Sequence, residues 1–155
     1  MAQEIERKFL VCGEFMAEVT ESAEIVQGYL SRTPDHTIRI RIMGNRGYIT
    51  VKGNPGKSGI ERYEWEKEIS VEDAKELLML CEPFPVHKTR YKVPSGGHIF
   101  EVDVFHGENE GLIVAELELK ERDEKYEKPE WLGVEVTGDP RYYNSNLSVR
   151  PFRGW

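Results

Sequence analysis

The sequence predicts a mainly β (α+β) fold, an eight-stranded antiparallel barrel in a single domain over residues 1–155. Polar and apolar residues alternate along most of the chain, which is the pattern of strands with one buried face. Short turn sequences separate these segments, and such turns join antiparallel neighbours. The length of 155 residues fits one domain. So many strands in so short a chain are best accommodated by closing the sheet into a barrel.

Eight segments carry the alternation expected of strands. In the clearest one, isoleucines at positions 38, 40 and 42 alternate with Arg39 and Arg41. Gly44-Asn45-Arg46-Gly47 follows directly and has the composition of a hairpin turn. The sequence therefore predicts strands near residues 4–9, 24–33, 36–42, 48–52, 59–69, 86–93, 98–106 and 112–120.

Helices are expected beside the strands. Ser70 is a good N-cap residue, and Asp73 follows it at the position of a capping box. Pro140 suits the first turn of a second helix near the C-terminus. We expect these helices to pack on the outside of the barrel, because they need an apolar surface. The predicted helices cover residues 14–20, 71–81 (with Pro83 after its end) and 140–148.

The charge balance and the cysteine count exclude several classes of protein. The chain has 21 Lys and Arg residues against 28 Asp and Glu residues, a net charge of −7, whereas a general nucleic-acid binder normally has a basic domain. No apolar run approaches the roughly 20 residues that span a bilayer, and the sequence MAQEIERKFL is too charged for a signal peptide. Cys12 and Cys81 form no CxxC pair, so neither a disulfide framework nor a zinc site is expected. We therefore expect a cytoplasmic protein with no nucleic-acid or membrane partner.

One face of the predicted strands is charged and carries few uncharged polar residues. The usual interpretation is the solvent-facing side of an antiparallel sheet. Three observations favour the barrel interior instead: the helices need the apolar face, Ser, Thr, Asn and Gln are rare on the charged face, and acids and bases segregate by strand. The residues of this face are Glu4, Glu6, Lys8, Arg39, Arg41, Lys52, Arg62, Glu64, Glu66, Lys88, Arg90, Lys92, Glu101, Asp103, Glu116, Glu118 and Lys120.

A charged interior of this kind suits an ionic ligand. Carboxylates at positions i and i+2 of a strand, such as Glu4 and Glu6, project to the same side about 7 Å apart. Mg²⁺ and Mn²⁺ prefer such oxygen ligands. The guanidinium groups of Arg39, Arg41 and Arg90 suit bidentate contacts with phosphate oxygens. The pattern therefore predicts one cavity that binds a divalent cation and a short phosphate chain.

The same residues fall in the motifs of a known family. Glu4-Ile5-Glu6-Arg7-Lys8 resembles the Glu-x-Glu-x-Lys signature of the CYTH superfamily, the triphosphate tunnel metalloenzymes. The resemblance implies an eight-stranded antiparallel tunnel that binds a triphosphate chain and hydrolyses or cyclises it with Mg²⁺ or Mn²⁺. It continues in order along nearly the whole chain, through Gln27-Gly28-Tyr29-Leu30, Arg39-Ile40-Arg41, Thr50-Val51-Lys52, Arg62-Tyr63-Glu64-Trp65-Glu66, Lys88-Thr89-Arg90-Tyr91, Phe100-Glu101-Val102-Asp103-Val104-Phe105, Glu116-Leu117-Glu118 and Val136-Thr137-Gly138-Asp139-Pro140-Arg141-Tyr142-Tyr143-Asn144.

The resemblance also implies roles for individual residues. Lys8 is expected to contact phosphate or to transfer a proton, and Arg62 to contact phosphate or to pair with a neighbouring glutamate. The metal ligands it implies are Glu4, Glu6, Glu116 and Glu118, with Glu64 and Asp103 beside a second metal or the attacking water. The phosphate-binding residues it implies are Lys8, Arg39, Arg41, Lys52, Arg62, Lys88 and Arg90.

The C-terminal helix departs from the family pattern. Some members place a lysine there that closes over the substrate, whereas this chain has Tyr143-Asn144-Ser145-Asn146. Arg141 is the candidate replacement for that lysine.

We expect a divalent-metal-dependent triphosphatase that converts inorganic tripolyphosphate to pyrophosphate and phosphate. One alternative is an adenylate cyclase of class IV, or a nucleoside or thiamine triphosphatase. Another is a non-catalytic binder of polyphosphate or a nucleotide, although a pure anion binder gains little from so many carboxylates. Two copies of the chain could also form a homodimer through an apolar outer strand.

Overall fold

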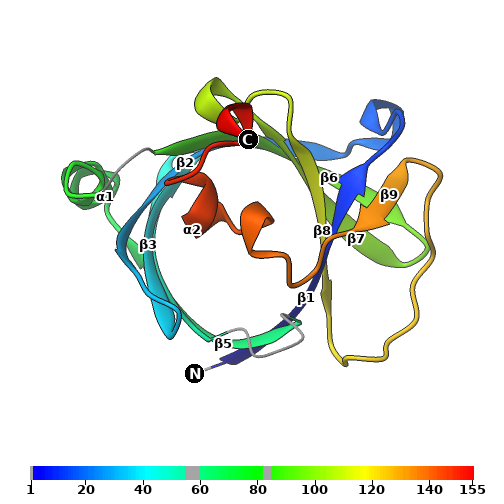
Figure 1. Ribbon diagram of the computed structural model, residues 1–155, viewed down its shortest axis with the longest axis horizontal. Coiled ribbons are helices and arrows are strands. Elements are labelled where there is room, and N and C mark those ends of the chain that lie inside the picture. The colour runs from blue at the N-terminus through cyan, green and yellow to red at the C-terminus, as the bar shows by residue number, and fades with distance from the viewer. Residues whose placement is uncertain (1, 55–59, 82–84) are drawn as a thin grey trace.

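In the residues that the structure describes, nine strands form one antiparallel sheet that closes into a barrel (Figure 1). The structure, a computed structural model, describes residues 2–54, 60–81 and 85–155. The strands in these residues are β1 (Ala2–Val11), β2 (Glu21–Arg32), β3 (His36–Met43), β4 (Arg46–Gly53), β5 (Glu61–Ile69), β6 (Val86–Ser95), β7 (His98–Phe105), β8 (Ile113–Leu119) and β9 (Leu132–Glu135).

Eight of these strands make the closed ring that the sequence predicts. The order is β5-β4-β3-β2-β6-β7-β8-β1, and pairing of β1 with β5 closes it. The remaining strand, β9, pairs with the second half of β1, opposite Phe9 and Val11. No alternation predicts β9, because its four residues are too few to show a period.

The strand register brings the charged residues to one face. Lys8 of β1 lies opposite Glu116 of β8, and Glu6 lies opposite Glu118. Residues directly opposite each other in a sheet share a face, and the next residue along each strand points to the other face. The other face carries a hydrophobic cluster on the outside of the barrel, so the charges point inward. Its buried residues are Phe9, Phe15, Val93, Phe100, Val102, Ala115, Leu117, Leu119 and Trp131.

One end of the barrel interior is apolar. Val86, Phe105 and Val114 lie two residues from Lys88, Asp103 and Glu116 on their strands, and therefore share the inward face. They pack with three side chains that follow β9 in the sequence. The cluster comprises Val86, Phe105, Leu112, Val114, Val136, Tyr142 and Leu147.

The helix α1 (Val71–Leu78) lies outside the barrel against β2, β3 and β4 (Figure 1). As predicted, Ser70 is its N-cap, and the Ser70 hydroxyl accepts a 3.0 Å hydrogen bond from the Asp73 N–H. The helix approaches β4 closely at Gly47, where a Cβ would lie 2.8 Å from the Ala74 Cβ. Glycine therefore allows this contact. The helix ends three residues before the predicted boundary at 81, and Pro83 lies outside the described residues.

Five further short helical segments are present in the described residues: η1 (Met16–Glu18), η2 (Gly107–Asn109), η3 (Pro140–Tyr142), α2 (Asn144–Leu147) and η4 (Phe152–Gly154). The first lies in the predicted helix 14–20 but is a single 3₁₀ turn. None of the helices in the described part of the chain is long and apolar enough to cross a membrane.

The helix predicted at residues 140–148 was expected to pack on the outside of the barrel. The C-terminal segment does not pack there. Tyr143 has extended backbone angles and separates η3 from α2. In Figure 1, both pieces lie within the ring of strands. The physical reason is the apolar end of the interior, where Tyr142 and Leu147 are buried. The segment therefore closes part of one end of the barrel.

Candidate functional site

The charged faces of the strands surround a cavity of about 160 Å³ inside the barrel. Its walls are almost entirely polar. Eleven of the thirteen predicted site residues line it: Glu4, Glu6, Lys8, Arg39, Arg41, Lys52, Arg62, Glu64, Arg90, Glu116 and Glu118.

Lys88 and Asp103 are not among the residues that line the cavity, and both side chains are completely buried. Lys88 Nζ lies 2.6 Å from Asp103 Oδ2. Arg90 contacts the same carboxylate through Nε at 2.8 Å and Nη2 at 2.9 Å. Burial alone raises the pKa of Asp103, but Arg90 and Lys88 outweigh burial and hold it below its ordinary value. Asp103 is therefore an ionised carboxylate whose two oxygens are both engaged.

Arg90 links this buried layer to the cavity. Its Nη1 lies 3.5 Å from Glu101 Oε2, and its Nη2 lies 3.9 Å from Glu116 Oε1. Burial alone raises the pKa of Glu116, but Lys8, Arg90 and Lys88 more than offset the desolvation and hold it well below its ordinary value. The guanidinium of Arg90 is thus fixed by carboxylates on two neighbouring strands.

Glu4, Glu6 and Glu118 form the acidic side of the cavity. The cations beside them only partly neutralise their negative charge. Burial raises the pKa of Glu4, and Lys52 only partly offsets it. Burial also raises the pKa of Glu6 well above its ordinary value, and the nearby Glu116 and Glu4 raise it further. The pKa of Glu118 is raised by burial and by Glu4. A cation bound between these carboxyl groups would stabilise their charged forms.

Lys52 is the cation nearest to the acidic side. Its Nζ lies 3.1 Å from Glu4 Oε1 and 3.4 Å from Glu64 Oε2. Arg62 Nε approaches the same oxygen of Glu4 at 3.8 Å. Arg62 therefore both lines the cavity and pairs with a glutamate, so the two roles that its position suggested are compatible.

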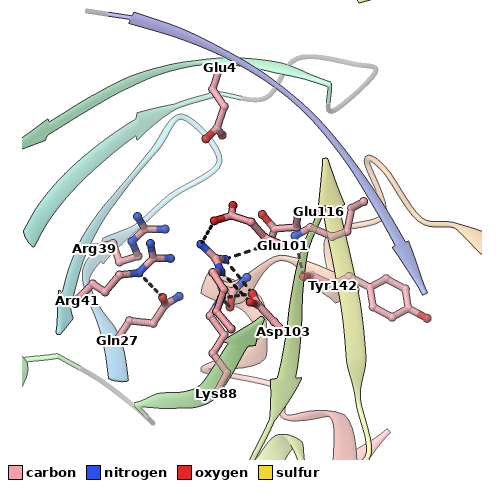
Figure 2. A network of polar contacts seen from close by, with 12 residues as sticks. Glu4, Gln27, Arg39, Arg41, Lys88, Glu101, Asp103, Glu116 and Tyr142 are labelled. Atoms are coloured by element: carbon pink, nitrogen blue, oxygen red, sulfur yellow. Dashed lines mark hydrogen bonds and ion pairs between the residues drawn. The ribbon is translucent and has the colours of Figure 1, made fainter. Parts of the chain in front are cut away.

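Two arginines face the acids from the opposite side of the interior (Figure 2). Arg41 Nε donates to Gln27 Oε1 at 2.9 Å, and Arg39 Nη2 donates to Thr50 Oγ1 at 3.2 Å. Burial lowers the pKa of Arg41 to about 9, and the neighbouring guanidiniums of Arg39 and Arg90 contribute to the decrease. The buried Nε of Arg39 has no hydrogen-bond partner in the structure. A crowded cationic wall with an unsatisfied donor is suited to a multiply charged anion.

The C-terminal segment supplies side chains that the strand pattern does not predict. Lys8 Nζ donates to the Tyr142 carbonyl at 3.2 Å, and Lys88 Nζ donates to Asn144 Oδ1 at 3.0 Å. The ring of Tyr143 lies 5.6 Å from Lys8 Nζ and 5.7 Å from the Arg62 guanidinium carbon. Further lining residues outside the predicted set are Tyr29, Thr37, Glu66, Glu101, Tyr143, Asn144 and Ser145. Glu66 and Glu101 share the charged strand face; the others have no comparable sequence signal.

Arg141 does not take the place of a cavity lysine. Its Nη2 pairs with Asp139 Oδ2 at 2.8 Å, and its guanidinium lies 5.5 Å from the centre of the Trp155 ring. It is not among the residues that line the cavity. In this structure Tyr143 occupies the position above Lys8 and Arg62.

A closed antiparallel barrel with a two-sided charged interior is the fold that the sequence motifs imply. The family model for the CYTH domain matches residues 2–144. The chain belongs to the CYTH family. An inorganic triphosphatase of Acetivibrio thermocellus is 45% identical over 156 residues, which covers 100% of this chain and 99% of that protein.

Two further comparisons involve the same family. An inorganic triphosphatase of Nitrosomonas europaea is 37% identical over 151 residues, covering 94% of this chain and 97% of that protein. The crystal structure of the inorganic triphosphatase NE1496 aligns with a TM-score of 0.69 at 35% identity and covers 96% of each chain. The CYTH assignment thus extends over nearly the full length in sequence and in structure.

The donor chemistry of this CYTH cavity fits a hard divalent cation. In the described residues, no three His, Cys, Asp or Glu side chains are already arranged as a metal cage. Mg²⁺ commonly keeps several waters and binds through one or two carboxylates together with substrate phosphates, so a complete protein cage is not required. Burial raises the pKa of Glu4 and of Glu6, and neighbouring carboxylates raise it further, so a bound cation would stabilise their charged forms.

Proposed function

We propose that this CYTH protein hydrolyses inorganic tripolyphosphate to pyrophosphate and phosphate with Mg²⁺ or Mn²⁺. The observation that carries the proposal is the division of one small cavity into a carboxylate side and a guanidinium side. A phosphate chain and its cation need opposite partners within a few ångströms of each other. The naming of two full-length relatives as inorganic triphosphatases supports the same activity.

The carboxylates that would hold the cation are on β1, β5 and β8. We assign this role to Glu4, Glu6, Glu116 and Glu118, with Glu64 at the edge of the group. Bound there, such a cation would neutralise charge on the phosphate chain and would lower the pKa of a water molecule. Asp103 was predicted beside the second metal or the water; because its oxygens are engaged by Lys88 and Arg90, we assign it instead to positioning these two cations.

The phosphate chain would lie against the cationic side chains. Arg39, Arg41 and Arg90 present guanidinium groups, which can contact two phosphate oxygens at once. Lys8, Lys52 and Arg62 approach from β1, β4 and β5. Lys88 adds positive charge from beneath the cavity without lining it. These fixed cations stabilise the charge that develops on the leaving pyrophosphate.

Hydrolysis requires water to attack a terminal phosphorus atom while the bridging P–O bond on the far side breaks. Glu64 is a suitable acceptor for a hydrogen bond from that water. Burial raises the pKa of Glu64, but Glu4 and Lys52 outweigh burial and hold it below the ordinary value. Glu64 is therefore ionised at neutral pH. Lys8, which lies between Glu116 and the Tyr142 carbonyl, can contact the attacked phosphate or donate a proton to it.

The test is phosphate release from tripolyphosphate, ATP and thiamine triphosphate, each with Mg²⁺, Mn²⁺ or EDTA. We expect metal-dependent release that is fastest on tripolyphosphate and is lost in Glu4→Gln. Cyclic AMP from ATP, without release from tripolyphosphate, would show an adenylate cyclase. Tight metal-free binding of tripolyphosphate without turnover of any substrate would show a binding protein.

A further inference from the structure

A cluster of polar side chains lies on the outer wall of the barrel, where β2, β6 and β7 are neighbours in the sheet. Lys88 points into the barrel, so its neighbours on β6, His87 and Thr89, point outward. Glu24 of β2 lies opposite Thr89. His106 follows β7 directly, and its backbone N–H donates to the His87 carbonyl at 2.9 Å. We call Glu24, His87, Thr89 and His106 the outer-wall cluster.

Short contacts join the side chains of the outer-wall cluster. His87 Nε2 lies 3.1 Å from Glu24 Oε2. The Thr89 hydroxyl donates to Glu24 Oε1 at 2.7 Å, and it lies 2.7 Å from His106 Nε2. The two imidazole rings have centroids 5.1 Å apart and planes tilted by 59°. Both imidazoles therefore face the same carboxylate, one of them directly and the other through the Thr89 hydroxyl.

Two imidazoles and one carboxylate are a ligand set that Zn²⁺ takes in proteins, with water in the fourth position. Two of the four histidines of the chain meet here, through the pairing of β6 with β7. Donors bound to a tetrahedral zinc ion lie roughly 3.4 Å from each other, and the 3.1 Å between His87 Nε2 and Glu24 Oε2 is close to that separation. The hydrogen bond from Thr89 lowers the pKa of Glu24, so this carboxylate is in its charged, metal-binding form at neutral pH.

We propose that the outer-wall cluster binds a divalent transition-metal ion such as Zn²⁺ through His87, His106 and Glu24. The chemistry differs from that of the cavity, because imidazole suits Zn²⁺ whereas the carboxylates of the cavity suit Mg²⁺ and Mn²⁺. None of these three residues lines the cavity, so the inference does not depend on the proposed function. The ion would tie β2 and β6 to the end of β7 and would stabilise the barrel, because it binds the folded chain.

Binding of the ion requires a small rearrangement of side chains. The three donors do not converge on one point, and the described residues hold no ready metal cage. The Thr89 hydroxyl lies between His106 and Glu24. The side chains of His87 and Glu24 are 50% and 63% exposed, so both change rotamer readily. We expect both to turn toward His106 when the ion binds, so that the ion replaces the hydrogen bonds of the Thr89 hydroxyl.

The test is calorimetric titration of the full chain with ZnCl₂, in excess MgCl₂ that competes with zinc for the cavity carboxylates. The wild-type protein should bind about one Zn²⁺ ion per chain. The variant His87→Gln/His106→Gln removes two ligands, and the matched control His36→Gln/His98→Gln removes the other two histidines. The variant should bind zinc at least about 100-fold more weakly, because the loss of a mere outer-shell partner already costs about 10–100-fold. The control should bind zinc as the wild-type protein does.

Three further measurements do not depend on the double variant. In ¹⁵N NMR of the histidine side chains of the wild-type protein, zinc should shift the Nε2 signals of His87 and His106 and leave those of the other two histidines in place. Glu24→Gln, which keeps the size of the side chain, should weaken zinc binding about tenfold. Zinc at ~100 times its Kd should raise the midpoint of thermal unfolding of the wild-type protein by about 5–10 °C.

Three results would overturn the proposal. Zinc binding that is as tight in His87→Gln/His106→Gln as in the wild-type protein would assign the ion to the cavity carboxylates. Zinc binding that is lost in His36→Gln/His98→Gln would assign it to those histidines. A wild-type protein that binds no zinc would leave the outer-wall cluster as an ordinary surface ion pair. Failure of the proposed function appears separately, as no phosphate release from tripolyphosphate with Mg²⁺, and it leaves the zinc titration unaffected.

Discussion

Lys88 Nζ lies 2.6 Å from Asp103 Oδ2, and neither side chain is exposed to solvent. Arg90 contacts both oxygens of the same carboxylate. One buried carboxylate is therefore shared by two cations, and Arg90 has two further carboxylate neighbours, Glu101 and Glu116. The positive charge of Lys88 lies beside the cavity where the phosphate chain is proposed to bind.

Replacing Asp103 tests how much of the fold depends on this layer. Asp103→Asn keeps the shape but removes the carboxylate that Lys88 and Arg90 share, and it leaves the buried Lys88 without its ion-pair partner. We expect the free energy of unfolding to fall by about 3 kcal/mol, measured by urea denaturation. Glu101→Gln, which removes a more exposed partner of Arg90, should cost less than about 1 kcal/mol. Equal effects of the two substitutions would contradict the account.

The activity should depend on the charge of Lys88. Burial lowers the pKa of Lys88 to about 7, and Asp103 offsets this only in part. As pH rises through that value, the positive charge beside the cavity is lost, so kcat/KM for tripolyphosphate should fall. Lys88→Met carries no charge at any pH and should show lower activity without this inflection. Persistence of the inflection in Lys88→Met would assign it to another group.

Stability without metal should fall as pH rises. The pKa of Glu6 in the folded protein is raised well above 4.5 by burial and by Glu116 and Glu4. A carboxyl group whose pKa is higher in the folded than in the unfolded protein stabilises the fold. This stabilisation is complete at pH values below the unfolded-state pKa, and it is lost as pH rises through the folded-state pKa. Mg²⁺ or Mn²⁺ should restore this stability, because a cation replaces the proton.

The variant Glu6→Gln isolates that contribution. In EDTA at about pH 8 it should be more stable than the wild-type protein by about 1 kcal/mol, and at about pH 5 the difference should be smaller. Thermal unfolding at both pH values measures this. A wild-type protein that is more stable than Glu6→Gln in EDTA at the higher pH would show that Glu6 is not under electrostatic strain.

Tyr143 should contribute to substrate binding, and Arg141 should not. The ring of Tyr143 faces Lys8 and Arg62 inside the cavity, whereas Arg141 pairs with Asp139 outside it. Tyr143→Ala should raise KM for tripolyphosphate about threefold or more, because two cations lose a cation–π partner worth about 0.5–1 kcal/mol each. Tyr143→Phe and Arg141→Ala should stay close to the wild-type value. A larger effect of Arg141→Ala would restore it as the replacement for the family lysine.

The strand pattern was sufficient to predict the barrel and most of the cavity. Alternation assigns each residue to one of two faces, and the need of α1 for an apolar surface decides which face is inside. Alternation does not give depth along the barrel axis. Lys88 and Asp103 share a face with Arg90 and Glu101, yet they lie deeper, between the apolar end and the cavity.

The C-terminal segment could not be predicted in the same way. Residues 140–148 show no clear period, and Tyr143 interrupts the helix that Pro140 begins. Their position depends on a tertiary contact, the burial of Tyr142 and Leu147 at the apolar end. The contributions of Tyr143 and Asn144 to the cavity follow from that contact. Homodimerisation stays a prediction.

Hydrolysis of a phosphate chain is proposed to need both the carboxylates and the cations of the cavity. The most direct measurement is the ³¹P NMR time course of tripolyphosphate with the protein and Mg²⁺, repeated with EDTA and with Glu6→Gln. We expect pyrophosphate and phosphate to appear in equal amounts with Mg²⁺, and we expect EDTA and the substitution to stop the reaction. Equal turnover in EDTA, or an unaffected Glu6→Gln, would contradict it.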